Sequence, residues 1–160
     1  RVYYSVFLRK WRLIFSTLWS RISSANEWQI ERSINDFQVI KFNGHFFSTS
    51  NVNQLHSNSV DFIVKELSLK NSDKTVVISH HVPTFLNFPS QYKGSNLNEA
   101  FVVELFPLIE SSIINYWIYG HHHSNTPDFS IGNTVLLTNQ LRYVRNQENL
   151  NFSLDKTIAL

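Results

Sequence analysis

The chain has 160 residues, of which 42% are hydrophobic and 14% aromatic, and its formal net charge is +2 at pH 7. This length and composition fit one folded domain and exclude a disordered or low-complexity chain. The small, scattered positive charge excludes a nucleic-acid surface built on electrostatics alone. Cysteine is absent, which excludes disulfides, thiolate metal sites and a cysteine nucleophile. Methionine is also absent, even at position 1, which indicates a processed or truncated product.

The opening segment RVYYSVFLRKWRLIFSTLWS is apolar, but three basic residues interrupt it. Arg9, Lys10 and Arg12 come too early for a membrane span or a signal-peptide core. We therefore expect a cytoplasmic protein with no membrane partner. Within the segment, YYSVF (3–7) and RLIFSTL (12–18) predict two strands joined by the charged turn LRKW.

The next stretch of the chain is polar at first, and regularly spaced apolar residues follow. SRISSANEWQIERSIND (20–36) predicts loop with some helix, whereas FQVIKF (37–42) alternates like a strand and is closed by the turn signal NG at 43–44. From Ser50 to Lys70, apolar residues recur at helical spacing, and Ser50 is a suitable N-cap. These apolar residues are Val60, Ile63, Val64 and Leu67.

Two short apolar runs in the second half predict strands that are buried on both faces, KTVVISHH (74–81) and INYWIY (114–119). Between them, Asn96 and Glu99 predict a capping box for a helix through about Phe106, which the following proline breaks or kinks. The connection between the two runs is long enough for a parallel crossover.

The tail PDFSIGNTVLLTNQLRYV (127–144) predicts two short strands around the turn GN at 132–133. The resulting order is strands, helix, buried strand, helix, buried strand and hairpin. This order predicts an α/β fold in which helices cover part of the sheet, and we expect one domain over residues 1–160.

Five of the seven histidines follow the two buried strands directly. His80 and His81 follow the first strand, and His121, His122 and His123 follow the second. Both groups are therefore expected at the carboxyl edge of the sheet, where open α/β sheets bind their ligands. Imidazole is the commonest metal ligand, because it is neutral near pH 7 and offers a directional lone pair. The sequence predicts a metal site here.

The spacing of the triple histidine suggests how the ligands divide. In an extended loop, His121 and His123 point the same way while the residue between them points elsewhere. His80 can complete the cluster, and Gly120 lets the chain turn sharply off the strand end and approach an ion. A purification tag is disfavoured, since it would be a longer run at a terminus. A satisfied surface turn remains the alternative for each histidine group.

Two motifs, with flanking segments, resemble the calcineurin-like metallophosphoesterases, which hydrolyse phosphate esters with two metal ions. VVISHHVPT (76–84) resembles the family's strand ending in histidine, and WIYGHHHSN (117–125) resembles its G-H-x-H motif. IFSTLW (14–19) is similar to a core strand of a bacterial branch, and LLTNQLRYV (136–144) to its closing segment. The resemblance runs from about residue 13 to the end of the chain. It implies an α/β/β/α sandwich with mixed sheets and outer helices, a phosphoester substrate and two divalent ions, either Mn, Fe or Zn.

Carried over by position, the resemblance implies metal ligands among the histidines. His80 and His121 match ligands of one metal and His123 matches a ligand of the other, while His122 fills the variable position between them. No catalytic residue is assigned beyond these ligands.

The neighbours of these ligands also have matches. His81 and Asn125 match residues that support the ligands, although the choice between His80 and His81 as the ligand is open by one residue. Arg142 stands where many relatives have glycine, so a different shape is expected for the closing loop. His45 and His56 stand apart from both groups and are given no role.

The chain departs from the family in lacking its Asp-x-His, Gly-Asp-x-x-Asp and Gly-Asn-His-(Asp or Glu) motifs. Those motifs normally precede the matched segments, so the resemblance implies the C-terminal part of such an enzyme. Two dications held about 3.5 to 4 Å apart need anionic oxygen ligands, which neutral imidazoles do not supply. Asp128 is the acid nearest in sequence to the triple histidine, and we interpret it as a turn residue.

The sequence therefore predicts a metal-dependent phosphoesterase in the intact protein, in which a metal-bound hydroxide attacks the phosphorus. For the chain alone we expect little or no hydrolysis, exposed apolar strand surface and aggregation. One alternative is a non-catalytic module whose histidines are structural or bind a single Zn²⁺. Another, a histidine-triad nucleotide hydrolase, is disfavoured because its alternation of histidine and apolar residues is absent from HHH. The substrate, the metal and the oligomeric state stay open.

Overall fold

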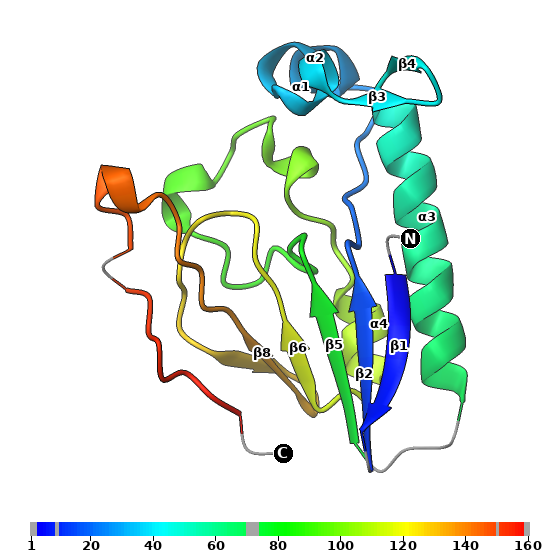
Figure 1. Cartoon of the computed structure of the whole chain (residues 1–160), viewed down its shortest axis with the longest axis vertical. Coiled ribbons are helices and arrows are strands. Elements are labelled where there is room, and N and C mark those ends of the chain that lie inside the picture. The colour runs from blue at the N-terminus through cyan, green and yellow to red at the C-terminus, as the bar shows by residue number, and fades with distance from the viewer. Residues whose placement is uncertain (1–2, 9, 70–73, 150, 159–160) are drawn as a thin grey trace.

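The computed structural model describes residues 3–8, 10–69, 74–149 and 151–158 (Figure 1). The helices in these residues are α1 (Glu27–Ser33), α2 (Asp36–Val39), α3 (Thr49–Ser68) and α4 (Phe106–Ser111). The strands are β1 (Tyr3–Leu8), β2 (Trp11–Ser16), β3 (Lys41–Phe42), β4 (His45–Phe46), β5 (Lys74–Ser79), β6 (Tyr116–Ile118), β7 (Phe129–Ile131) and β8 (Thr134–Leu137). No helix in the described part of the chain combines the length and the apolar composition that crossing a bilayer requires.

The described strands form a six-stranded sheet in the order β1-β2-β5-β6-β8-β7 and a separate hairpin of β3 and β4. β2, β5, β6 and β8 run parallel to one another. At the two edges of the sheet, β1 pairs antiparallel with β2 and β7 pairs antiparallel with β8. The predicted α/β class and the predicted parallel crossover between β5 and β6 are confirmed. Because the parallel strands share one direction, their carboxyl ends meet at the same edge of the sheet.

One face of the large sheet carries the main core. Ile14 of β2, Trp117 of β6 and Leu136 of β8 are fully buried there. Ile63 of α3 and Ile109 of α4 belong to the same cluster, so both helices cover this face. Burying large apolar side chains of this kind stabilises a fold by about 1.5 to 3 kcal/mol each.

The opposite face of the sheet is only partly covered by the described residues, and we call it the open sheet face. On the edge strand β1, Tyr4, Val6 and Leu8 are 52%, 45% and 52% exposed. Aromatic rings on this face stack on each other, as Tyr4 and Phe15 do at 4.7 Å between centroids. The exposed apolar strand surface that the sequence predicted is present on β1, whereas Val76 and Leu137 of the same face are buried. The partly exposed residues of the face are Trp11, Leu13, Phe15, Ile78, Tyr116, Ile118 and Val135.

The strand predicted over residues 37–42 is wrong for most of its length. Residues 36–39 form α2, and the strand is limited to β3. The helical turn buries Phe37 in a second, smaller core that also contains Ile30 and Phe47, so tertiary packing overrides the local alternation. The predicted turn is confirmed, since Asn43 and Gly44 have φ of 51° and 84°, as a primed hairpin turn requires.

The long helix α3 starts with a different N-cap from the one predicted. Ser48, not Ser50, caps it: the Ser48 side chain accepts a hydrogen bond from the Asn51 N–H, and the Asn51 side chain accepts one from the Ser48 N–H. Ser50 lies inside α3, so it cannot form this reciprocal pair at the start of the helix. Lys70, the predicted end of the helix, and Arg9 of the predicted turn lie outside the described residues.

The capping box predicted at Asn96 and Glu99 is also wrong. The Glu99 carboxylate instead accepts hydrogen bonds from the backbone N–H and the hydroxyl of Ser23, at 2.7 and 3.1 Å. The helix in this region begins at Phe106, so Pro107 opens α4 rather than ending a helix. Proline suits the first turn of a helix, where its missing N–H would have no partner.

Candidate functional site

The carboxyl ends of the parallel strands bring the predicted histidine groups together. Beyond β2 and β5, the His81 N–H donates to the Thr17 carbonyl at 3.2 Å. Beyond β5 and β6, the Gly120 N–H donates to the His80 carbonyl at 3.1 Å. These backbone bonds extend the sheet pairing past the regular strands. As predicted, the residues that follow β5 and β6 therefore lie side by side.

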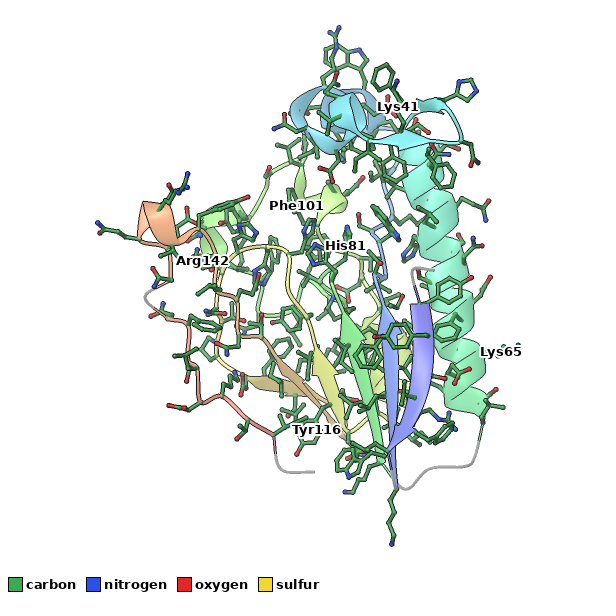
Figure 2. The ribbon with its side chains drawn as sticks, viewed as in Figure 1. Lys41, Lys65, His81, Phe101, Tyr116 and Arg142 are labelled. Carbon is green, nitrogen blue, oxygen red and sulfur yellow. The ribbon has the colours of Figure 1, made fainter. Side chains whose placement is uncertain are left out.

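Three imidazole rings form a cluster around His121. Its ring centroid lies 4.4 Å from that of His80 and 4.3 Å from that of His81. The rings of His80 and His81 are 5.4 Å apart. In Figure 2, His81 lies beyond the ends of β2 and β5, next to Phe101. We call these three side chains the histidine cluster.

His81 is the most rigidly held member of the cluster. Its side chain is buried, and Nδ1 lies 3.1 Å from the Thr17 carbonyl oxygen. A carbonyl only accepts, so Nδ1 carries the proton and the lone pair is on Nε2. Burial, followed by the neighbouring His121 and His80, lowers the pKa of His81 well below 6.5. The ring is therefore neutral at pH 7.

His121 is neutral for the same physical reason. Burial, followed by the neighbouring His80, lowers the pKa of His121 to about 3, while the Ala100 backbone opposes the shift. His81 and His121 are therefore both neutral at pH 7, and each ring has one nitrogen that carries a lone pair.

His80 is more exposed than the other members of the cluster. Loss of water around the ring lowers the pKa of His80, as does His123, whereas the Asp36 carboxylate raises it. Asp36 also lines a cavity of about 120 Å³ together with His81 and His121. Sequence reasoning missed Asp36, because it lies far along the chain from every histidine of the site and no motif marks it.

His122 lies outside the cluster, in the core. It is 6% exposed, and its ring packs edge-on against Tyr119 and Phe88. Nδ1 accepts hydrogen bonds from the Ser124 N–H and the Gln140 side-chain amide, each at 3.1 Å. Burial lowers the pKa of His122 to about 4. The structure thus assigns the middle histidine to packing.

The triple histidine forms a tight turn, so the predicted extended loop is wrong. His121 and His123 have φ of 74° and 48°, both in the left-handed region. Gly120 does not have a positive φ, and a Cβ there would meet the His80 carbonyl oxygen at an ordinary 3.6 Å. The sharp turn is therefore made by the histidines and not by the glycine. The His123 ring packs edge-on against Tyr143 at 4.8 Å between centroids.

Gln140, which follows β8, holds this turn in place. Its side-chain oxygen accepts from the His123 N–H at 2.9 Å, while its side-chain amide donates to His122 Nδ1 and to the Ser124 carbonyl. Asn125 in turn holds Gln140. Its side chain accepts from the Gln140 N–H at 2.6 Å and donates to the Gln140 carbonyl at 3.0 Å. The structure thus gives Asn125 a positioning role. Nothing in the sequence around Gln140 distinguishes it from an ordinary loop residue.

Strained backbone concentrates at this edge of the sheet. Leu18 and Trp19, after β2, have φ of 67° and 55°. His56 of α3 supports them, since its Nδ1 lies 3.3 Å from both of their carbonyl oxygens. Left-handed backbone costs bulky residues roughly 1 to 2 kcal/mol each, and such residues cluster at functional sites. His56 therefore has a supporting role that the sequence did not indicate.

The closing loop contains a left-handed residue. Arg142 has a φ of 65°, a conformation that glycine adopts more readily than arginine, and its guanidinium donates to the Glu148 carbonyl at 3.0 Å. The expected difference in the shape of this loop stays a prediction.

The described residues do not complete a metal site by themselves. No three His, Asp or Glu side chains among them are arranged to hold one ion. Asp128 pairs with Lys156 at 2.5 Å and lies in irregular chain directly before β7, so its interpretation as a turn residue is wrong. The imidazoles meet the chemical requirement of a metal ligand, a neutral ring with an available lone pair, but the carboxylates that two dications need are missing from this arrangement.

Comparison with known proteins adds one relative. The chain is 36% identical over 150 residues to an uncharacterized protein of Acanthamoeba polyphaga mimivirus, and the match covers 86% of this chain. It spans about half of the viral protein, 52% of its length. No protein-family model matches the chain, and no solved structure matches it.

Proposed function

We propose that this chain contributes the histidine ligands of a metal-dependent phosphoesterase whose other ligands lie outside residues 1–160. The observation that carries the proposal is the convergence of His80, His81 and His121 at the carboxyl edge of a parallel sheet, with ring centroids 4.3 to 5.4 Å apart. Open α/β sheets bind ligands at this edge. The resemblance of the two histidine motifs to the calcineurin-like family supplies the reaction class.

The tautomers of the cluster favour His81 over His80 as a ligand. His81 has its Nδ1–H anchored to the Thr17 carbonyl, the arrangement that commonly orients a metal-ligating histidine. Burial keeps His121 neutral as well, so its ring can also act as a ligand. His80 is more exposed, and its charge state is coupled to Asp36. We therefore place His81 and His121 first, with His80 and His123 as the further candidates.

The roles of the residues follow from their surroundings. Thr17 holds the His81 ring, Gln140 holds the turn, and burial keeps the rings unprotonated. A bound divalent metal would supply Lewis acidity toward a phosphate oxygen and an activated water. Because no carboxylate in the described residues completes the donor set, we assign no hydrolytic step to the chain alone.

The same proposal includes the detailed architecture, an α/β/β/α sandwich. In an α/β/β/α sandwich, a second sheet packs on the first at a distance of about 10 Å. The open sheet face, with Tyr4, Val6 and Leu8 about half exposed, is of the kind that such packing buries. The viral relative is about twice as long as the matched region, which leaves room in that protein for a second sheet.

The proposal is tested with the longer natural protein and with residues 1–160. Metal content and hydrolysis of an aryl phosphate are measured for both. We expect bound Mn, Fe or Zn and turnover in the longer protein, with weak single-metal binding and no turnover in the short chain. His81→Ala and His121→Ala should abolish turnover, whereas His45→Ala, at an exposed histidine of β4, should not. Absence of turnover in the longer protein would refute the enzyme assignment.

The absence of a complete ligand set among the described residues favours a second candidate, a non-catalytic module that binds one Zn²⁺ or none. If the module binds one Zn²⁺, a chelator should lower the melting temperature of residues 1–160, and His121→Ala should remove this effect; if it binds none, the chelator should leave the melting temperature unchanged. A longer protein that is active and loses its activity on metal removal would exclude this candidate.

A further inference from the structure

A second cavity lies beside the triple histidine. Its volume is about 450 Å³, which is within the usual range for small-molecule pockets. Its walls include the three consecutive histidines and four aromatic side chains, Phe88, Tyr92, Phe101 and Tyr143. We call it the aromatic pocket.

Three of these aromatic rings each contact a different histidine. Phe101 lies 4.8 Å from His121, and Phe88 lies 5.7 Å from His122. Tyr143 lies 4.8 Å from His123, all measured between ring centroids. The aromatic walls are therefore positioned by the same turn that carries the candidate ligands. A molecule in the pocket lies directly against this turn.

The polar groups of the pocket are mostly engaged in its own structure. Asn98 donates through its side chain to the Tyr92 carbonyl at 2.7 Å, and the Ser95 hydroxyl accepts from the Leu97 N–H at 3.3 Å. The lining contains no Asp, Glu, Lys or Arg. The surface available to a ligand is therefore mainly aromatic and uncharged, which selects a flat, uncharged group over a charged or strongly hydrated one.

We propose that the aromatic pocket binds the planar aromatic portion of a phosphate ester whose phosphate lies toward the histidine cluster. This inference rests on the proposed function for the identity of the substrate as a phosphoester. The orientation of the substrate in this proposal follows from the position of His121. This residue lines both the aromatic pocket and the smaller cavity that His81 and Asp36 also line. A substrate that spans the two cavities has its aromatic group in the larger one.

Binding to residues 1–160 tests the proposal without metal or turnover. Affinities are measured by NMR titration for 1-naphthyl phosphate, 1-naphthol and glycerol phosphate. We expect both naphthyl compounds to bind and glycerol phosphate to bind at least tenfold more weakly. Tyr92→Leu and Tyr143→Leu should each weaken naphthyl binding by roughly two- to tenfold, the contribution of one aromatic pair. Thermal melting verifies that each variant is folded.

Tyr4→Leu is the matched control, because Tyr4 is about as exposed as Tyr143 and lies on the open sheet face. It should leave naphthyl affinity unchanged. Loss of affinity in Tyr4→Leu but not in Tyr143→Leu would overturn the proposal, as would equal affinities for 1-naphthyl phosphate and glycerol phosphate. Because 1-naphthol has no phosphate, its binding can succeed even if the longer protein hydrolyses nothing, so the two proposals fail separately.

Discussion

Neighbouring histidines of one short turn have different surroundings and therefore different roles. His121 joins the histidine cluster, His122 packs in the core and His123 lies against Tyr143. Burial keeps His121 and His122 unprotonated at pH 7. A proton on either ring would be a charge in a poorly hydrated place, so the fold excludes it. This exclusion makes stability depend on pH.

We predict that the protein loses stability as the pH falls from about 6.5 to about 4. The pKa of His122 falls from 6.5 in the unfolded chain to about 4 in the fold, so in this window the unfolded chain binds a proton that the folded chain does not. His122 alone contributes on the order of 3 kcal/mol to this loss. Urea unfolding between pH 7 and pH 4 measures it.

The variant His122→Asn keeps an acceptor near the Ser124 N–H but has no titrating ring. It should show a shallower fall in unfolding free energy over the same pH range. His45→Asn, at an exposed histidine, should leave the slope unchanged. An unaltered slope in His122→Asn would show that its buried ring is not a source of the acid sensitivity.

Gln140 is the second residue with a measurable role. Gln140→Leu removes the acceptor of the His123 N–H and the donors to His122 and Ser124. We expect a loss of about 2 to 4 kcal/mol in unfolding free energy, because partly buried partners lose their hydrogen bonds. Denaturant unfolding tests this. Gln54→Leu, on the exposed side of α3, should change stability by about 0.5 kcal/mol or less.

At the scale of elements, a local contact holds the start of α3 and a long-range contact holds its end. Ser48 and Asn51 cap its start locally. At its other end, the buried Arg12 of β2 donates to the carbonyls of Glu66 and Leu69. A cation at a helix C-terminus interacts favourably with the helix dipole. The helix that covers the core face is thus tied to a central strand.

Ser48→Ala should destabilise the protein by about 1 kcal/mol, since the Asn51 N–H loses its acceptor at the helix start. Thermal or denaturant unfolding measures the change. Ser57→Ala, within the same helix and exposed, serves as the control and should be nearly neutral. If the two variants lose equal stability, the cap at Ser48 does not contribute.

At the scale of the whole molecule, the two faces of the sheet are unequal. One face packs on α3 and α4 (Figure 1), while the open sheet face carries half-exposed apolar side chains on β1 and partly exposed ones on β2, β5, β6 and β8. Contiguous apolar surface of this kind mediates association, and an apolar edge strand such as β1 adds unpaired backbone groups.

We predict that residues 1–160 self-associate through the open sheet face. Val6→Lys should shift the chain toward the monomer in sedimentation velocity, because a charge at this position opposes burial of the face. Val39→Lys, the same substitution at a 70% exposed valine of α2, should have no such effect. In any longer form in which a second sheet covers this face, Val6→Lys should instead destabilise the fold. A wild-type chain that is already a monodisperse monomer would contradict the prediction.

Sequence patterns correctly predicted the elements that depend on interactions between residues close together in the sequence. The strands β1, β2, β5 and β6 and the Asn43–Gly44 turn are present as predicted, but β6 is not buried on both faces, because Tyr116 and Ile118 are partly exposed. Predictions failed where distant contacts decided the outcome. Phe37 is drawn into a core with Ile30 and Phe47, and Glu99 pairs with Ser23 rather than capping a helix. These partners are separated along the chain, so no short window contains the signal.

The sequence by itself determined that two histidine groups follow two buried strands, and with parallel pairing this places them at one edge of a sheet. Only the tertiary structure decided which rings meet. It brings His80, His81 and His121 together, turns His122 into the core and supplies Gln140 and Asp36 from distant segments. The physical reason is that local apolar patterns determine which segments form strands. The direction of each ring depends instead on left-handed backbone and hydrogen bonds that form only in the folded chain.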